Sequence, residues 1–223
     1  MAGRVMLHNN VLSKPGQIFL LDADINITDK PKYVSRAGDK LAAALKTFKV
    51  DVSGKNCLDV GASTGGFTDC LLKHDAAHVT SVDVGYGIID NSLRNSPLVT
   101  VVDKTNFRYV KPKSLEYYPF DLVTIDVSFI SIKKILPVAF ECAKNVGSII
   151  ALVKPQFEAD YKTVSKNKGV LKNKNIHETI INDIIVFTGS CRFKVTSTFE
   201  SPVKGRKGNI EYFLLLDVEN NIK

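Results

Sequence analysis

The 223-residue sequence contains no tryptophan, only two methionines and four cysteines, none of them in a CxxC arrangement. The cysteines stand within apolar runs, at Cys57, Cys70, Cys142 and Cys191. They therefore predict buried thiols in a reducing compartment, and not disulfides or zinc ligands. No apolar run approaches the roughly 18 residues that cross a bilayer, and the first ten residues lack the apolar centre of a signal peptide. These absences favour a cytoplasmic location and predict neither a membrane span nor a metal site.

The charge balance is basic, with 30 Lys and Arg against 23 Asp and Glu, a net charge of +7 and a pI near 9.1. A hydrophobic content of 44% supports one medium-sized domain and a small appendage. The positive excess favours a polyanionic partner only weakly, because many basic proteins bind no nucleic acid.

From about Lys55 onward, short apolar runs alternate with helical patterns. We expect strands at residues 56–60, 78–84, 98–103, 120–129 and 147–155, and two more at 192–199 and 211–218. Continuous apolar strands between helices indicate a parallel sheet that is covered on both faces. Only a short loop joins the last two strands, so these should be antiparallel neighbours. The pattern predicts an α/β, Rossmann-like methyltransferase fold, with a seven-stranded, mostly parallel sheet, an antiparallel last strand and helices on both faces.

Residues 1–29 differ from the rest of the chain. They contain short β-like stretches and turn signals but too little apolar mass for a core of their own. We expect a boundary near residues 28–32, which separates residues 1–29 from a catalytic domain at 30–223. A helix should begin directly after Ser35, a favourable N-cap residue.

A glycine-rich turn, GASTGG at residues 61–66, follows the first strand of the predicted sheet. Ligands of doubly wound sheets bind at this edge, and glycines let them touch the backbone. The preceding Asp59 suits a ligand with a positive group, such as the sulfonium and ammonium of S-adenosylmethionine. Asp83 ends the second strand, where an acidic side chain binds ribose hydroxyls. The alternative is that the glycines only shape a tight turn and Asp83 only caps a loop.

Four charged side chains interrupt or border apolar segments, namely Lys40, Asp126, Lys154 and Glu211. A charge near a core is costly unless it is paired. Three of them belong to the carboxyl edge of the sheet or its last hairpin, so they can meet Lys40 there. The alternative is a pair of structural salt bridges.

This set suits the methylation of a ribose 2′-hydroxyl, a weak nucleophile that must lose its proton as it attacks. A lysine can accept that proton only while part of it is neutral, and burial or a neighbouring cation favours the neutral amine. Lys154 beside Lys40 is the candidate base, and Asp126 and Glu211 would hold the two amines in place.

A series of motifs resembles a known family closely: YVSRAGDKL, CLDVGASTGGFTDCLL, VDVGYG, DKTNFRY, LVTIDVSFISIKKILP, LVKPQFE, GVLKN and KGNIEYF. In this order they resemble the TlyA-type (hemolysin A) ribosomal RNA 2′-O-methyltransferases, relatives of the FtsJ-type enzymes, over essentially the whole chain. The resemblance implies S-adenosylmethionine as cofactor, ribosomal RNA or ribosomal subunits as partner, and a catalytic tetrad at Lys40, Asp126, Lys154 and Glu211. It implies donor-binding residues at Asp59, Gly61, Ala62, Ser63, Thr64, Gly65, Gly66, Phe67, Asp83, Val84, Asp103, Thr105, Asn106 and Asp126.

The family begins with an αL-type RNA-binding domain, and residues 1–29 resemble only its second half. Two basic segments should lie at the same edge as Lys154, where they either neutralise RNA phosphates or only form a solvated face. Their residues are Lys162, Lys166, Lys168, Lys172, Lys174, Lys204, Arg206 and Lys207.

Four aromatic side chains, Tyr86, Tyr109, Phe129 and Phe157, either stack on bases or belong to the core.

Three other functions compete with RNA methylation. A membrane-active hemolysin, as the family label suggests, would need an amphipathic or membrane-spanning stretch, which the sequence does not show. A small-molecule methyltransferase would share the donor site but not the basic segments. A fold that only binds RNA would not need an intact tetrad.

Overall fold

The computed structural model describes residues 5–7, 10–12, 16–27, 31–189 and 193–218. The chain falls into two compact units, residues 1–32 and 33–223. In the first unit, strands β1 (Val5–Leu7), β2 (Asn10–Val11) and β3 (Ile25–Ile27) form an antiparallel sheet in the order β2-β1-β3. Cys191, one of the predicted thiols, lies outside the described residues.

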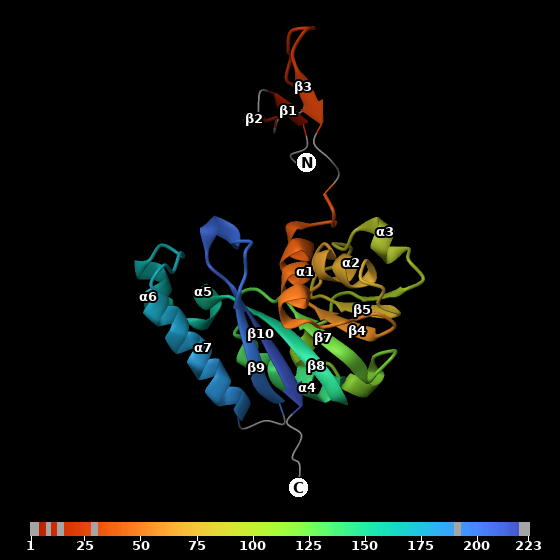
Figure 1. Cartoon of the computed structure of the whole chain (residues 1–223), viewed down its shortest axis with the longest axis vertical. Coiled ribbons are helices and arrows are strands. Elements are labelled where there is room, and N and C mark those ends of the chain that lie inside the picture. Colours follow the sequence, from red (N-terminus) through yellow and green to blue (C-terminus); the bar gives the residue numbers. More distant parts are fainter. Residues whose placement is uncertain (1–4, 8–9, 13–15, 28–30, 190–192, 219–223) are drawn as a thin grey trace. The chain divides into compact units, whose positions relative to one another are not determined.

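A seven-stranded sheet forms the centre of the second unit, in the order β6-β5-β4-β7-β8-β10-β9 (Figure 1). Its strands are β4 (Asn56–Val60), β5 (His78–Val82), β6 (Val99–Val102), β7 (Phe120–Ile125), β8 (Ala143–Val153), β9 (Phe193–Glu200) and β10 (Tyr212–Val218). Only β10 runs against its neighbours, pairing antiparallel with both β8 and β9. The predicted fold class and the antiparallel last pair are confirmed.

Helices cover both faces of this sheet (Figure 1). They are α1 (Arg36–Phe48), α2 (Gly66–Leu72), α3 (Asn91–Arg94), α4 (Leu136–Cys142), α5 (Pro155–Glu158), α6 (Tyr161–Lys166) and α7 (Lys174–Gly189). Short 3-10 turns occupy Phe107–Tyr109, Pro112–Ser114, Ile132–Lys134 and Arg206–Gly208. Side chains of α1 and α2 pack on one face, and those of α4 and α7 on the other.

The core has two layers because successive residues of a strand point to opposite faces. In β10, Phe213 joins the layer under α1 and α2, whereas Leu214 and Leu216 join the layer under α4 and α7. In β8, the pairing with β7 shifts register after Ala143, since Phe120 of β7 pairs with Ala143 but Leu122 pairs with Ser148. The strand therefore begins earlier than the sequence predicts, but its regular pairing starts at Ser148.

Helix α1 begins where the sequence predicts. The Ser35 hydroxyl accepts a hydrogen bond from the amide of Ala37 at 3.3 Å, as an N-cap does. The helix ends at Lys49, which adopts the left-handed conformation that closes many helices. Its buried face, with Leu41 and Leu45, contacts α2, so the helix presents its first two turns to the carboxyl edge of the sheet.

Phe213 belongs to the core layer beneath α1 and α2, so its replacement tests how much this layer contributes to stability. It is fully buried, and its ring lies 6.1 Å from the ring of Phe67. We expect Phe213→Ala to lower the free energy of unfolding by about 3–5 kcal/mol, measured by urea denaturation. The exposed Val186→Ala is the control and should change it by less than about 0.5 kcal/mol. A similar effect of both substitutions would contradict this account of the core.

Candidate active site

Two adjoining cavities open at the carboxyl edge of the parallel strands. The larger has a volume of about 490 Å³ and the smaller about 370 Å³. They share five lining residues, Gly61, Ser63, Asp126, Ser128 and Phe129. A ligand of two parts can therefore lie across both, with one part in each cavity.

The glycine-rich turn forms the wall between the cavities. Gly61 has a φ of 84°, and a Cβ atom there would come within 2.5 Å of the backbone oxygen of Asp126. Only glycine lets β4 and β7 end this close together. The Asp83 carboxylate accepts hydrogen bonds from the amides of Ser63 at 2.8 Å and Gly85 at 2.7 Å. Asp83 thus shapes the turn and also lines the smaller cavity.

Most of the predicted donor-binding residues line these cavities. Gly61, Ala62, Ser63, Thr64, Phe67 and Asp126 line the larger one, and Gly61, Ser63, Asp83, Val84, Thr105, Asn106 and Asp126 line the smaller one. Asp59, Gly65, Gly66 and Asp103 line neither. Asp103 instead pairs with Arg94 at 2.7 Å, which fixes the loop beside the smaller cavity.

Asp59 lies behind the turn and is fully buried. Its carboxylate accepts hydrogen bonds from the hydroxyls of Thr68 at 2.7 Å and Thr124 at 3.2 Å. Burial, followed by the charge of Asp126, raises the pKa of Asp59 to about 7, although the hydrogen bonds oppose this. Asp59 therefore lines neither cavity, and its contact with a positive ligand group stays a prediction. Asp59 shares the α2 face of β4 with Cys57, because the strand alternates between faces.

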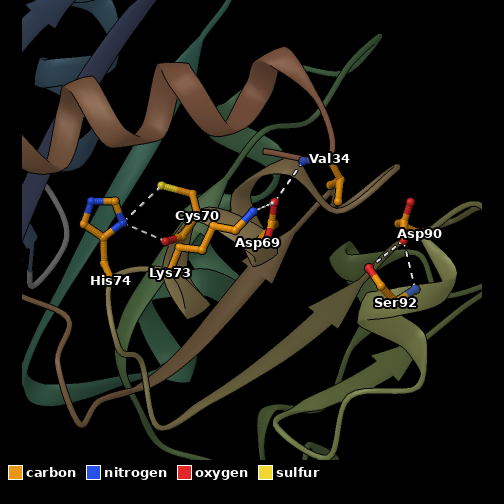
Figure 2. A network of polar contacts seen from close by, with 7 residues as sticks. All are labelled: Val34, Asp69, Cys70, Lys73, His74, Asp90 and Ser92. Carbon is orange, nitrogen blue, oxygen red and sulfur yellow. Dashed lines mark hydrogen bonds and ion pairs between the residues drawn. The ribbon is translucent and has the colours of Figure 1, made fainter. Parts of the chain in front are cut away.

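Side-chain contacts hold the helices around the turn (Figure 2). Asp69 of α2 accepts hydrogen bonds from the amide of Val34 at 2.8 Å and from Lys73 at 2.9 Å, which fixes the start of α1. Asp90 caps α3 by accepting from the amide and hydroxyl of Ser92. The amide of Asp90 also donates to the carbonyl of Thr64. The start of α1 is thus bound to α2, which follows the turn, and the start of α3 is bound to the turn itself.

The first buried ion pair joins α1 to the end of the chain. Lys40 Nζ lies 2.6 Å from Glu211 Oε2, and the two side chains are 12% and 3% exposed. Gly205 makes room for Glu211, because a Cβ atom at this position would overlap the carboxylate. The amide of Gly205 donates to the carbonyl of Asn209, which closes the loop over the pair.

The second ion pair joins β8 to β7. Lys154 Nζ lies 2.6 Å from Asp126 Oδ1, and the two side chains are 11% and 17% exposed. The same amine donates to the hydroxyl of Ser128 at 2.9 Å. All four residues predicted as a tetrad line the larger cavity. The structure therefore brings together charged residues from four separate elements.

Glu158 lines neither cavity but supports the segments around them, and the sequence analysis missed it. Its carboxylate accepts hydrogen bonds from the Ser131 hydroxyl at 2.6 Å and the Ile132 amide at 2.8 Å, and burial raises its pKa. It thereby joins the segment after Lys154 to the segment after Asp126. The motif KPQFE places it one helical turn beyond Lys154, which is the only signal for it in the sequence.

Phe129 and Phe157 form an aromatic pair at the mouth of the larger cavity, with ring centroids 4.8 Å apart. Phe129 is 86% exposed and has a φ of 62°, a strained conformation for a bulky residue. Tyr86 and Tyr109 are also exposed but line neither cavity. The Phe129 ring is thus exposed at the cavity on a strained backbone.

Neither a membrane-spanning helix nor a metal-binding group occurs in the described part of the chain. None of its helices is long and apolar enough to cross a bilayer. No cluster of three His, Cys, Asp or Glu side chains there could hold a metal ion. The cysteines described are buried, and burial raises the pKa of Cys57 and of Cys142 to about 12.

The sheet order, the glycine-rich turn and the paired cavities define a Rossmann-like methyltransferase that uses S-adenosylmethionine. The model of the FtsJ-like methyltransferases matches residues 33–218. The chain belongs to this family and, within it, to the group of TlyA and hemolysin A proteins.

Three similar proteins support this assignment. Hemolysin A of Brachyspira hyodysenteriae is 42% identical over 95% of this chain and 88% of its own length. The 16S/23S rRNA (cytidine-2′-O)-methyltransferase TlyA of Mycobacterium tuberculosis is 40% identical over 87% of this chain and 72% of its own. The solved structure of a Streptococcus thermophilus protein described as a hemolysin has a TM-score of 0.85 and 35% identity, and the match covers 99% of this chain and 80% of that one.

The raised pKa of Asp59 gives a prediction about pH. The folded protein holds this proton up to about pH 7, whereas the unfolded chain loses it near pH 4. The stability that the neutral carboxyl provides is complete below about pH 4 and is lost as the pH rises through about 7. We expect the stability of Asp59→Asn relative to the wild type to rise by on the order of 2–4 kcal/mol between those limits.

Urea denaturation at a series of pH values measures this difference, and Asp51→Asn, at an exposed position, controls for the substitution itself. A difference for Asp59→Asn that stays constant with pH would refute the assignment.

Gly205 gives a prediction about the first ion pair. In Gly205→Ala, the new methyl group would push the Glu211 carboxylate away from Lys40. We expect the free energy of unfolding to fall by about 1–3 kcal/mol and methyl transfer to fall with it. Gly189→Ala is the matched control, since its Cβ would meet nothing within 4 Å. If Gly205→Ala is as stable as Gly189→Ala, the packing of Glu211 is not as tight as described.

Proposed function

We propose that this protein transfers the methyl group of S-adenosylmethionine to a ribose 2′-hydroxyl of ribosomal RNA. The observation that carries the proposal is the pair of lysine–carboxylate contacts in a cavity that adjoins a second cavity with the features of a donor site. The name of the Mycobacterium tuberculosis relative, a 16S/23S rRNA (cytidine-2′-O)-methyltransferase, supports the substrate class.

The residues present fit the cofactor. Asp83 offers carboxylate oxygens to ribose hydroxyls, and the close contact at Gly61 keeps side chains away from the place where the two cavities meet. Asp126 lines both cavities and supplies negative charge at their junction. When bound, S-adenosylmethionine supplies a methyl group on a positively charged sulfur, which leaves as a neutral thioether.

Lys154 is the proposed base. Its amine lies in the larger cavity, where the acceptor hydroxyl would enter, and takes the proton that the hydroxyl releases. Asp126 and Ser128 fix the position of this amine through the 2.6 Å and 2.9 Å contacts. Lys40, held by Glu211, adds a positively charged side chain to the same wall of the cavity.

The acceptor nucleotide would be held by the aromatic pair and by basic residues. Phe129 is exposed at the cavity mouth, where its ring can stack on an unpaired base. Lys204 lines the same cavity and can neutralise a phosphate.

We also propose that residues 1–29 are part of an αL-type RNA-binding module. The protein would work in the cytoplasm, where ribosomes are assembled.

The hemolysin alternative has no structural feature in its favour in the described part of the chain. Relatives of this family carry both a hemolysin and a methyltransferase name. The cavities and the ion pairs fit the second name.

One experiment tests the reaction itself. Purified protein is incubated with methyl-labelled donor and ribosomal subunits that lack the modification, and the labelled position is mapped by its resistance to alkaline cleavage. A 2′-O-methyl group blocks this cleavage because the free hydroxyl is the attacking group. Label found on a base, or only on low-mass metabolites in a competing extract, would reject the proposal.

Replacement of the base gives a sharper prediction. Lys154→Met keeps the apolar stem but removes the amine, so we expect methyl transfer to fall by about 10²–10⁴-fold. Donor binding, measured by calorimetry, should not weaken, because Asp126 remains in place. Lys144→Met is the matched control, since Lys144 belongs to β8, the strand that leads to Lys154, and pairs with Asp121 at 2.7 Å outside both cavities. Full activity of Lys154→Met would show that another group accepts the proton.

A further inference from the structure

The segment of residues 161–174, here called the lysine segment, leads from α6 into α7. It contains Lys162, Lys166, Lys168, Lys172 and Lys174, all of them exposed. Lys168 and Gly169 both have positive φ angles, 52° and 80°, so the chain turns sharply after α6. A short turn of this kind does not by itself fix the direction of the lysines that flank it.

Asn209, from the loop before β10, binds the backbone of this turn. Its side-chain amide donates to the carbonyl of Gly169 at 3.0 Å and accepts from the amide of Leu171 at 3.1 Å. Asn209 is 4% exposed and Leu171 is 2% exposed. The buried Asn209 side chain thus pairs with the backbone of this stretch as a neighbouring strand would, because it supplies both a hydrogen-bond donor and an acceptor.

His177 of α7 binds the turn from the other side. Its Nε2 lies 3.1 Å from the carbonyl of Leu171, and its Nδ1 lies 3.0 Å from the hydroxyl of Tyr212. A carbonyl can only accept, so Nε2 carries the proton and Nδ1 accepts from the tyrosine. The ring is almost completely buried. Both backbone polar groups of Leu171 are therefore bound by side chains from outside the segment.

These contacts also join the segment to the proposed tetrad. Asn209 precedes Glu211 by two residues, and Tyr212 follows it directly. Lys207 reaches the turn, since its amine lies 4.0 Å from the place of a Cβ atom on Gly169. Lys204, in the same loop, lines the larger cavity. A line of positive charge therefore extends from the cavity to the lysine segment along one loop.

We propose that Asn209 and His177 are positioning residues that hold the lysine segment as a preformed, phosphate-contacting surface for RNA. This inference rests on the proposed function and adds the part of the chain that fixes the substrate. The backbone between these lysines need not be ordered on binding, because the buried side chains have already fixed it. The same anchors lie beside Glu211, so docked RNA and the Lys40–Glu211 pair share one support.

The first test compares Asn209→Ala with Asn182→Ala, which changes an exposed amide on α7. Asn209→Ala keeps every lysine but removes both contacts with the turn. We expect its affinity for ribosomal RNA fragments to fall about tenfold, while its affinity for S-adenosylmethionine stays the same. Hydrogen exchange of the Leu171 amide, free of RNA, should become faster in this variant alone.

The outcomes separate this inference from the proposed function. If the wild type neither binds nor methylates ribosomal RNA, the proposed function fails and this inference fails with it. If the wild type binds RNA and Asn209→Ala binds it equally well despite fast exchange at Leu171, only the positioning role is refuted. Loss of donor binding in Asn209→Ala would mean that the variant is misfolded, and the second test then decides.

The second test leaves the buried contacts intact. Lys168→Gln with Lys172→Gln removes two exposed charges from the segment, and we expect the slope of log affinity against log salt concentration to decrease by about 1 to 2. The matched control, Lys46→Gln with Lys113→Gln, removes two exposed charges at the end of α1 and in the turn before β7. Equal slopes in the two double variants would overturn the assignment of this surface to RNA.

Discussion

Four charges in the wall of one cavity are tolerable only as pairs, and much of the second unit is arranged to make that pairing possible. An isolated buried charge costs several kcal/mol, and removal of one partner leaves the other uncompensated. Lys40 comes from the first helix of this unit and Glu211 from the loop before its last strand. The pair therefore joins the two ends of the domain at the cavity. Lys154 and Asp126 do the same for neighbouring strands at the centre of the sheet.

Such pairing needs backbones that approach closely. Glycines, which have no side chain, make this approach possible. Gly61 lies against the carbonyl of Asp126, and Gly205 lies against the carboxylate of Glu211. Each of these glycines makes room for one acidic member of the set. Glu158 and Asn209 then fix the loops on either side by hydrogen bonds to backbone groups. The charged side chains are thus held by a support of uncharged contacts, which limits their movement when a ligand enters.

The sequence predicted the sheet and the charged set because both leave local signals. The strand at residues 56–60 has the bounds of β4, and Asp126 and Lys154 stand out where apolar runs end. Glu158, Asn209 and His177 leave no such signal, because each resembles an ordinary polar residue until its partner is known. Asp59 lies behind the turn for a local reason. Its position in β4 points it toward α2, in keeping with the period-two alternation of a strand.

The contact between Lys154 and Asp126 also bears on the order of events in catalysis. The Asp126 carboxylate, 2.6 Å from the amine, can stabilise the positive charge that the amine would gain with a proton. If Lys154 is the base, the amine must lose the proton of one turnover before the next acceptor arrives. The cavity is open to solvent at its mouth, beside the exposed Phe129, which offers water as the proton acceptor. The contact with Asp126 would then favour completion of methyl transfer, because the carboxylate stabilises the positive charge that Lys154 gains with the proton.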